Sequence, residues 1–171
     1  MKIRNILTAA LCLISSAAFA QSDYDVSKDA ENGAVVFKGQ CSFADLQKEP
    51  SFSWFAKGEA DYKPDTNAVA YLKQHLKDYE LVILMGTWCD DSQNLLPKLH
   101  KALTDAGYPV ASVKMYGVDR SKQTKYIEHK AYSLEKVPTI IVTKNNGEVG
   151  RIVENVKKNI ETDLVQIIKA K

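Results

Sequence analysis

The sequence has few of the residues that mark several specialised protein classes. Three cysteines among 171 residues are too few for the disulfide framework of a small secreted domain. Eight glycines and five prolines exclude collagen-like repeats. Lysine and arginine number 23 against 21 acidic residues, so no strongly basic face for nucleic acid is expected. With 45% hydrophobic residues, the chain is expected to form one globular domain beside a short extension.

The apolar run within the first twenty residues is too short to span a membrane. Lys2 and Arg4 precede an apolar run over residues 6–14, and Ala18-Phe19-Ala20 has the small-x-small pattern that signal peptidases cut. A membrane anchor, the alternative, needs about 20 apolar residues. We therefore expect residues 1–20 to be a signal peptide. The protein is then exported, periplasmic in a Gram-negative bacterium and otherwise secreted, without stable membrane insertion after cleavage.

Residues 21–64 are predicted to form an N-terminal extension that packs on the main domain. Residues 21–32 are polar and lack apolar periodicity, which predicts a loose leader. A short strand at 35–37 is expected to end at the glycine that follows, and residues 42–45 fit a capping box that opens a helix. Aromatic residues between 50 and 64 predict a loop whose side chains fill the core, with a ligand-binding surface as the alternative.

Residues 65–171 alternate between helix and strand patterns. The continuous apolar run at 81–85 predicts a strand buried at the centre of a sheet. The predicted order is helix 65–79, strand 81–85, helix 91–106, strand 110–118, helix 122–132, strand 139–143, strand 148–153 and a final helix near 160–168. This order predicts an α/β fold with a central mixed sheet flanked by helices.

Cys89 lies between the predicted strand 81–85 and the helix that follows it. At a helix N-terminus, unpaired backbone N–H groups and the helix dipole stabilise an anion. The thiolate, the species that attacks disulfides, is therefore favoured at this position. Asp90 and Asp91 oppose this effect by charge repulsion.

Four segments of the chain resemble the thioredoxin superfamily, and they occur in the family's order. Trp88-Cys89-Asp90-Asp91-Ser92 is similar to the W-C-x-x-C signature, with serine in place of the second cysteine. Pro97 matches the proline of the active-site helix, and Val137-Pro138-Thr139 resembles the cis-proline loop. The segment 144–148 resembles the K-N-G-E hairpin with one extra asparagine, and the resemblance covers about residues 66–169.

This resemblance implies a thioredoxin-like fold and thiol–disulfide exchange by an oxidoreductase or isomerase. Cys89 would be the nucleophile, with Trp88 and Ser92 shaping the catalytic site. Val137, Pro138 and Thr139 would bind the substrate backbone. The partners would be protein or small-molecule thiols and disulfides, with no cofactor. The stretch from Met85 to Ser92 is similar to that of exported bacterial thioredoxin-like proteins with a single active-site cysteine.

The chain departs from the family pattern in ways that restrict the mechanism. Ser92 cannot displace a product from a mixed disulfide, although its hydroxyl can donate a hydrogen bond to the Cys89 thiolate. Ile83 stands where many members place a buried carboxylate. A mixed disulfide on Cys89 would be released by an external thiol, by a second substrate thiol, or by Cys41 as a resolving cysteine. The third route needs the two Cα atoms within about 7 Å, and a small semi-buried residue is the alternative interpretation of Cys41.

Two other functions stay open at this point. The fold could serve as a binding module that uses the groove beside Pro138, or as a sensor in which Cys89 is oxidised to a sulfenic acid. A metal site is not expected, because His75, His100 and His129 lie on separate predicted helices without ligand spacing. These histidines are predicted to lie at the surface. The oligomeric state and the substrate do not follow from the sequence.

Overall fold

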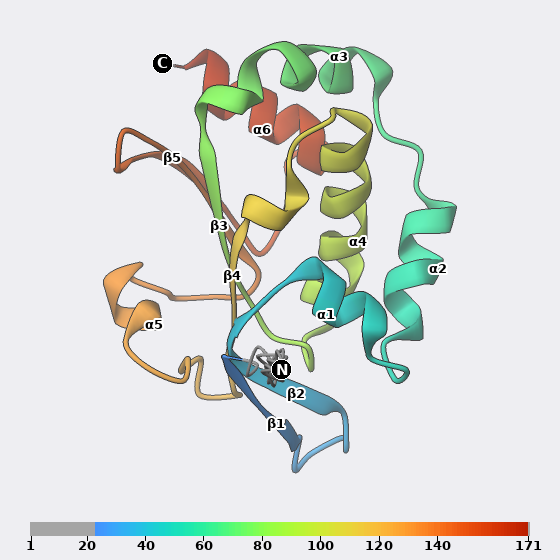
Figure 1. Ribbon diagram of the computed structural model, residues 1–171, viewed down its shortest axis with the longest axis vertical. Coiled ribbons are helices and arrows are strands. Elements are labelled where there is room, and N and C mark those ends of the chain that lie inside the picture. Colours follow the sequence, from blue (N-terminus) through green and yellow to red (C-terminus); the bar gives the residue numbers. More distant parts are fainter. Residues whose placement is uncertain (1–22, 171) are drawn as a thin grey trace, which may run out of the picture.

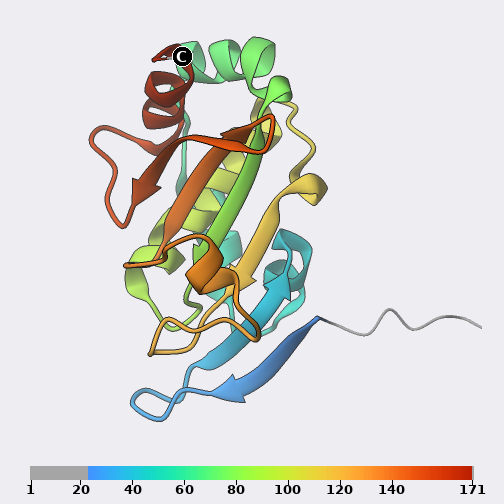
Figure 2. The same ribbon diagram turned by 90° about the vertical axis from the view of Figure 1, so that its left-hand side faces the viewer.

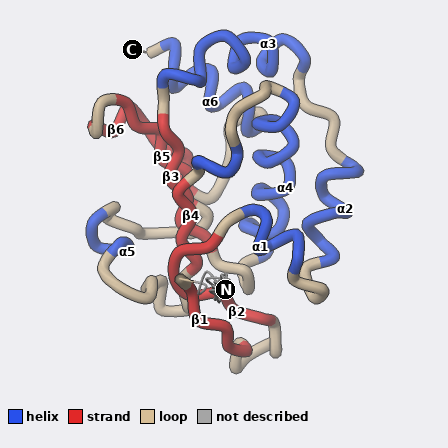
Figure 3. Tube along the Cα trace, in the orientation of Figure 1, coloured by secondary structure: helices blue, strands red, loops and turns tan. Residues whose placement is uncertain are grey.

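A six-stranded sheet runs through the molecule in the order β1-β2-β4-β3-β5-β6 (Figures 1 and 3). The structure, a computed structural model, describes residues 23–170, so the predicted signal peptide lies outside the described residues. Strands β3 and β4 are parallel, and the other neighbouring pairs are antiparallel. The predicted α/β class with a mixed central sheet is confirmed.

Helices and strands of the main part follow the predicted order closely. They are α3 (Thr66–His75), β3 (Glu80–Met85), α4 (Asp90–Asp105), β4 (Lys114–Gly117), α5 (Glu128–Ala131), β5 (Thr139–Lys144), β6 (Gly147–Val153) and α6 (Ile160–Lys169). Short 3-10 turns lie at Leu76–Asp78 and Val110–Ser112. The side chain of Asp65 accepts hydrogen bonds from two backbone N–H groups at the start of α3 and so caps the helix.

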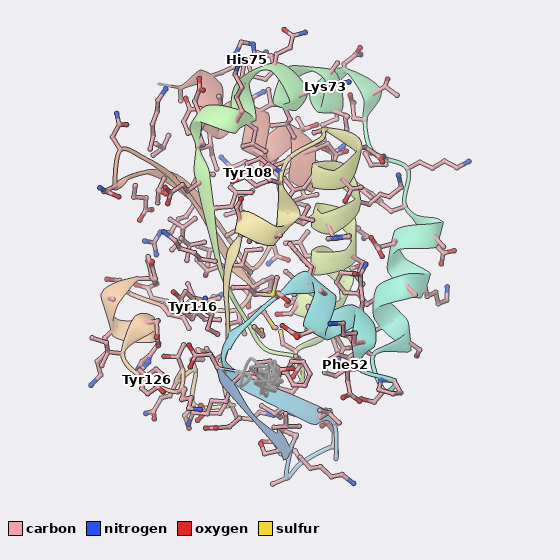
Figure 4. The ribbon with its side chains drawn as sticks, in the orientation of Figure 1. Phe52, Lys73, His75, Tyr108, Tyr116 and Tyr126 are labelled. Atoms are coloured by element: carbon pink, nitrogen blue, oxygen red, sulfur yellow. The ribbon has the colours of Figure 1, made fainter. Side chains whose placement is uncertain are left out.

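The sheet has two apolar faces of unequal size. Alternate residues of β3 point to opposite sides. Ile83 and its neighbours on one side join the main core under the helices, whereas Val82 and Leu84 join a small cluster on the other. Figure 2 shows α5 in front of the sheet, with α1, α2 and α4 behind it. Tyr116 and Phe52 mark these opposite sides in Figure 4. Both faces of β3 are therefore buried, as its continuous apolar run predicts.

The predicted loose leader is wrong, because residues within it form an edge strand. Strand β1 (Tyr24–Lys28) pairs with β2 (Val35–Cys41). Four of the five β1 residues are exposed, so no apolar alternation marked the strand. Strand β2 does not end at Gly39, whose positive φ of 125° and lack of a side chain let β1 approach. A Cβ there would lie 2.5 Å from the Asp23 carbonyl oxygen.

The remaining extension is helical. Helix α1 (Phe43–Lys48) begins with the predicted capping box, in which the Ser42 and Asp45 side chains each accept a bond from the other's backbone N–H. Helix α2 (Ser53–Asp61) replaces the predicted aromatic loop and packs on α4. Phe55 is fully buried, so the aromatic segment fills the core as predicted.

Two predicted elements between β4 and β5 are shorter than expected. Of the strand predicted for 110–118, only β4 is formed, because a 3-10 turn occupies residues 110–112. The helix predicted for 122–132 is reduced to α5. Before it, Asp119 accepts backbone hydrogen bonds from Lys122 and Gln123, and Lys122 has a φ of 58° that a helix does not allow. The turn around Asp119 thus prevents an earlier helix start.

Candidate functional site

Cys89 is the N-cap residue of α4, at the point where the chain leaves the carboxyl end of β3. Its backbone N–H donates to the Gly86 carbonyl, and its carbonyl accepts from the Gln93 N–H, each at 3.0 Å. The thiol is partly exposed. The first-turn N–H groups of a 16-residue helix therefore lie beside a sulfur atom that reagents can reach.

The Cys89 thiol faces the loop that precedes β5. Its Sγ atom lies 3.5 Å from the Val137 carbonyl oxygen, to which the thiol donates. The Val137–Pro138 peptide bond is cis in this structure. Thr139 is buried, and its hydroxyl donates to the Lys136 carbonyl at 2.7 Å. The structure thus brings Cys89 together with the backbone of the predicted substrate-binding loop, while the Thr139 side chain serves that loop's own geometry.

Ser92 lies in the first turn of α4 and is completely buried. Its Oγ atom accepts a hydrogen bond from the Gly86 N–H at 3.3 Å. Within residues 23–170, the Ser92 side chain forms this hydrogen bond and none with Cys89, to which it was predicted to donate. Ser92 therefore supports the turn that carries Cys89.

Trp88 borders the site and is held on two sides. Its indole Nε1 donates to the Val118 carbonyl at 2.8 Å. Gly86 lies against the ring, and a Cβ on Gly86 would be only 2.7 Å from the Trp88 Cε2 atom. The guanidinium of Arg120 lies over the ring, 4.7 Å from its centroid. Glycine at position 86 is thus required for the observed position of Trp88.

Thr87 is a site residue that the sequence analysis missed. It is buried, and its hydroxyl donates to the Val35 carbonyl at 2.7 Å and accepts from the Phe37 N–H at 3.3 Å. The Thr87 carbonyl in turn accepts from the Gln93 side chain at 2.8 Å. These bonds join the turn that carries Cys89 to β2. No local pattern could reveal them, because the partners lie about fifty residues apart in the sequence.

A family profile for thioredoxin matches residues 64–170, more than half of the chain. The chain belongs to the thioredoxin family. Thiol–disulfide redox chemistry is therefore its function at the level of the family. Strands β1 and β2 and helices α1 and α2 precede the matched residues. No curated protein matches the chain.

Several solved structures are similar to this thioredoxin-family chain. A protein of unknown function from Pseudomonas aeruginosa is 17% identical over 77% of this chain and 81% of its own, with a TM-score of 0.51, which shows the fold alone. The reduced thioredoxin pre-protein of Schistosoma mansoni is 27% identical over 64% of this chain and 93% of its own (TM-score 0.39). Mitochondrial thioredoxin 3 of Saccharomyces cerevisiae, in its oxidised form, is 20% identical over 67% and 99% (TM-score 0.35).

Cys41 does not join the thioredoxin site. Both cysteines within the described residues are free thiols. Cys41 is buried in β2 and pairs with Met115 of β4, which pairs with Ile83 of β3, six residues before Cys89. Two strand spacings already amount to about 9.5 Å, beyond the Cα separation of about 7 Å that a disulfide allows. Burial raises the pKa of Cys41 to about 12, and the Asp45 carboxylate adds to this effect.

The three histidines are dispersed. One of them, His100, is buried, although all three were predicted to lie at the surface. His100 is buried against Phe43 and Phe55, and its Nδ1 pairs with Glu59 of α2. Helix α2 of the extension covers it, which the sequence of α4 alone could not indicate. Within residues 23–170, no cluster of three histidine, cysteine or acidic side chains could hold a metal ion. Nor does any described helix have the length and hydropathy needed to cross a membrane.

Proposed function

We propose that this protein is an exported monothiol thiol–disulfide oxidoreductase, of the reductase or isomerase type, that acts through Cys89. The observation that carries the proposal is the environment of the Cys89 sulfur. The Cys89 thiol is partly exposed, lies at the N-cap of α4 and faces the Val137 carbonyl. The resolving position holds a buried serine, and Cys41 is distant and buried.

The first step is attack of the Cys89 thiolate on one sulfur of a substrate disulfide. A bond forms between the Cys89 Sγ atom and that sulfur, and the substrate S–S bond breaks. The other sulfur leaves with the electron pair as a thiolate, which takes its proton from water. The substrate backbone would lie along the loop at Val137 and Pro138, where Cys89 is already in contact.

The second step releases the enzyme from the mixed disulfide. An external small thiol, or a second thiol of the same substrate, attacks the substrate sulfur and forms a new disulfide with it. Cys89 leaves as a thiolate and is regenerated. With an external thiol the product is a mixed disulfide of the substrate and the small thiol, and a second molecule of that thiol then releases the reduced substrate and forms the small-molecule disulfide. With a substrate thiol the disulfide is isomerised, without net oxidation.

Export is supported by the first twenty residues, which lie outside the described part of the chain. The basic start, the short apolar run and Ala18-Phe19-Ala20 have the pattern of a cleaved signal peptide. An oxidising compartment would supply the disulfides on which Cys89 acts. The protein would reside in the periplasm of a Gram-negative bacterium or be secreted from another cell.

The test compares Cys89→Ser with Cys41→Ala as the matched control. Activity is measured as refolding of a protein with scrambled disulfides in the presence of reduced glutathione. Cys89→Ser is expected to reduce the rate at least about 100-fold, since it removes the nucleophile, whereas Cys41→Ala retains most of it. Full activity of Cys89→Ser, or no mixed disulfide on the wild-type Cys89, would support the binding module instead.

A further inference from the structure

Arg120 connects the N-terminal hairpin to the active-site tryptophan. Its guanidinium stacks on Trp88, and its Nε and Nη2 atoms donate to the two carboxylate oxygens of Asp29 at 2.8 and 3.0 Å. Asp29 belongs to the turn between β1 and β2, outside the residues that match the thioredoxin profile. Bidentate hydrogen bonding of this kind fixes the plane of the guanidinium as well as its position.

Asp29 is built to hold this cation. Its side chain is only 2% exposed in the ion pair with Arg120. One of its oxygens also accepts backbone N–H groups of Glu31 and Asn32, each at 3.0 Å. The bond to Arg120 is the main cause that lowers the pKa of Asp29 to about 2. Asp29 is thus ionised at neutral pH, and the turn presents it rigidly to Arg120.

Other groups near Arg120 contribute less. Glu31 lies 3.0 Å from the Nη1 atom, but its side chain is 70% exposed, and exposed ion pairs are weak. Two more ion pairs join the hairpin to the loop after β4, Lys38 with Asp119 at 2.6 Å and Lys125 with Asp25 at 2.9 Å. The first of these pairs offers a matched control, because it joins the same segments without an observed contact to Trp88.

The charge of Arg120 also acts on Cys89. Hydrogen bonding to Asp29 is the main cause that raises the pKa of Arg120, and the negative charge of a Cys89 thiolate contributes in the same direction. The cation over Trp88 is thus attracted to negative charge at position 89. Because Trp88 directly precedes Cys89, the stacked cation also restrains the turn that carries the sulfur.

We propose that the β1–β2 hairpin completes the Cys89 site, with Arg120 as a positioning residue that Asp29 holds over Trp88. This inference rests on the proposed role of Cys89 as a nucleophile and goes beyond it. The hairpin is then part of the chemistry of the site, in addition to being an edge of the sheet. Loss of the Asp29–Arg120 pair would leave the strand pairing of the hairpin in place and weaken the nucleophile.

The experiment measures the alkylation rate of Cys89 by iodoacetamide against pH, read from the mass of the Cys89 peptide. The variants are Arg120→Gln, Arg120→Lys and Asp29→Asn, with Lys38→Gln as the control. Arg120→Gln is expected to slow alkylation at pH 7 roughly threefold to tenfold and to move the midpoint of the profile to higher pH. Arg120→Lys is expected to react faster than Arg120→Gln but more slowly than the wild type, because lysine keeps the positive charge but cannot form the bidentate pair with Asp29.

Asp29→Asn is expected to give an intermediate effect, since Arg120 remains charged but loses its ionic anchor. Lys38→Gln is expected to leave the profile unchanged. The inference is overturned if Arg120→Gln and Asp29→Asn both keep the wild-type profile, or if Lys38→Gln shifts it equally. Alkylation needs no disulfide substrate. A wild-type protein that fails to form a mixed disulfide therefore contradicts the proposed function, while the comparison among variants still decides the role of Arg120.

Discussion

Cys41 lies inside the sheet at the end of β2, whereas Cys89 lies at the partly exposed start of α4. The two side chains are chemically identical. Burial and a neighbouring carboxylate raise the pKa of Cys41 to about 12 and keep it neutral. Cys89 instead lies at the start of a helix, its thiol directed at a backbone carbonyl, next to the tryptophan on which Arg120 stacks. The contrast teaches that the fold, through where it places each thiol, decides which of the two can act as a nucleophile.

The largest expected difference is the rate at which the two thiols react. In the native protein at pH 8, iodoacetamide should modify Cys89 at least about 1,000-fold faster than Cys41. Only about one Cys41 in 10,000 is a thiolate at that pH, given a pKa of about 12, and the side chain is also buried. Peptide mass mapping after timed quenching measures both rates. Similar rates for the two cysteines would contradict this difference in reactivity.

The same pKa predicts a pH dependence of stability. The folded pKa of Cys41 lies above the unfolded value of about 8.5, so the neutral thiol contributes to the free energy of unfolding below pH 8.5. This contribution is lost as the pH rises towards 12. Denaturant unfolding at pH 8 and pH 10.5 should therefore show a larger loss of stability for the wild type than for Cys41→Ala. An equal loss would contradict the assignment.

A change beside Cys89 should affect both the stability of the protein and the reactivity of that thiol. In Gly86→Ala, the new methyl group would lie 2.7 Å from the Trp88 ring, so the ring must move. We expect the free energy of unfolding to fall by about 1–3 kcal/mol and the Cys89 alkylation rate to change several-fold. Gly147→Ala is the matched control, because its Cβ would lie 3.5 Å from the Lys144 carbonyl, an ordinary contact. Equal effects of the two substitutions would argue against the proposed fit of Trp88.

The smallest expected effect concerns the link between the two regions. Thr87→Val removes the hydroxyl that bonds Val35 and Phe37 of β2, and should cost about 1–2 kcal/mol of stability. Thr162→Val is the control, since the buried Thr162 hydroxyl oxygen forms no hydrogen bond among the described residues. Thermal unfolding of both variants checks the difference. A Thr87→Val protein as stable as Thr162→Val would show that the link contributes nothing.

Local sequence patterns predicted the main domain because its elements carry their own periodicity and end signals. The apolar run of β3, the cap at Asp65 and the W-C segment are all contiguous in sequence. Strand β1 escaped prediction because it is an exposed edge strand, and backbone pairing with β2 needs no apolar alternation. The helix expected over 122–132 failed because hydrogen bonds around Asp119 favour a turn.

The parts of the site that the sequence did not predict depend on contacts between segments that are distant in the chain. Asp29 and Arg120 are 91 residues apart in sequence, and neither belongs to a recognisable motif. Thr87 similarly shows its role only once β2 lies beside the active-site turn. His100 was expected at the surface because α2, which covers it, was expected to be a loop. Long-range pairing of this kind has no local signature.

The most direct test of the central claim is the mass of the protein after exposure to oxidised glutathione. We predict one glutathione adduct, mapped to Cys89, that persists until an external thiol is added, because no second cysteine of residues 23–170 lies within reach. A Cys41–Cys89 disulfide, seen as the loss of two hydrogens without an adduct, would contradict it. An adduct on Cys41 in the folded protein would contradict it equally.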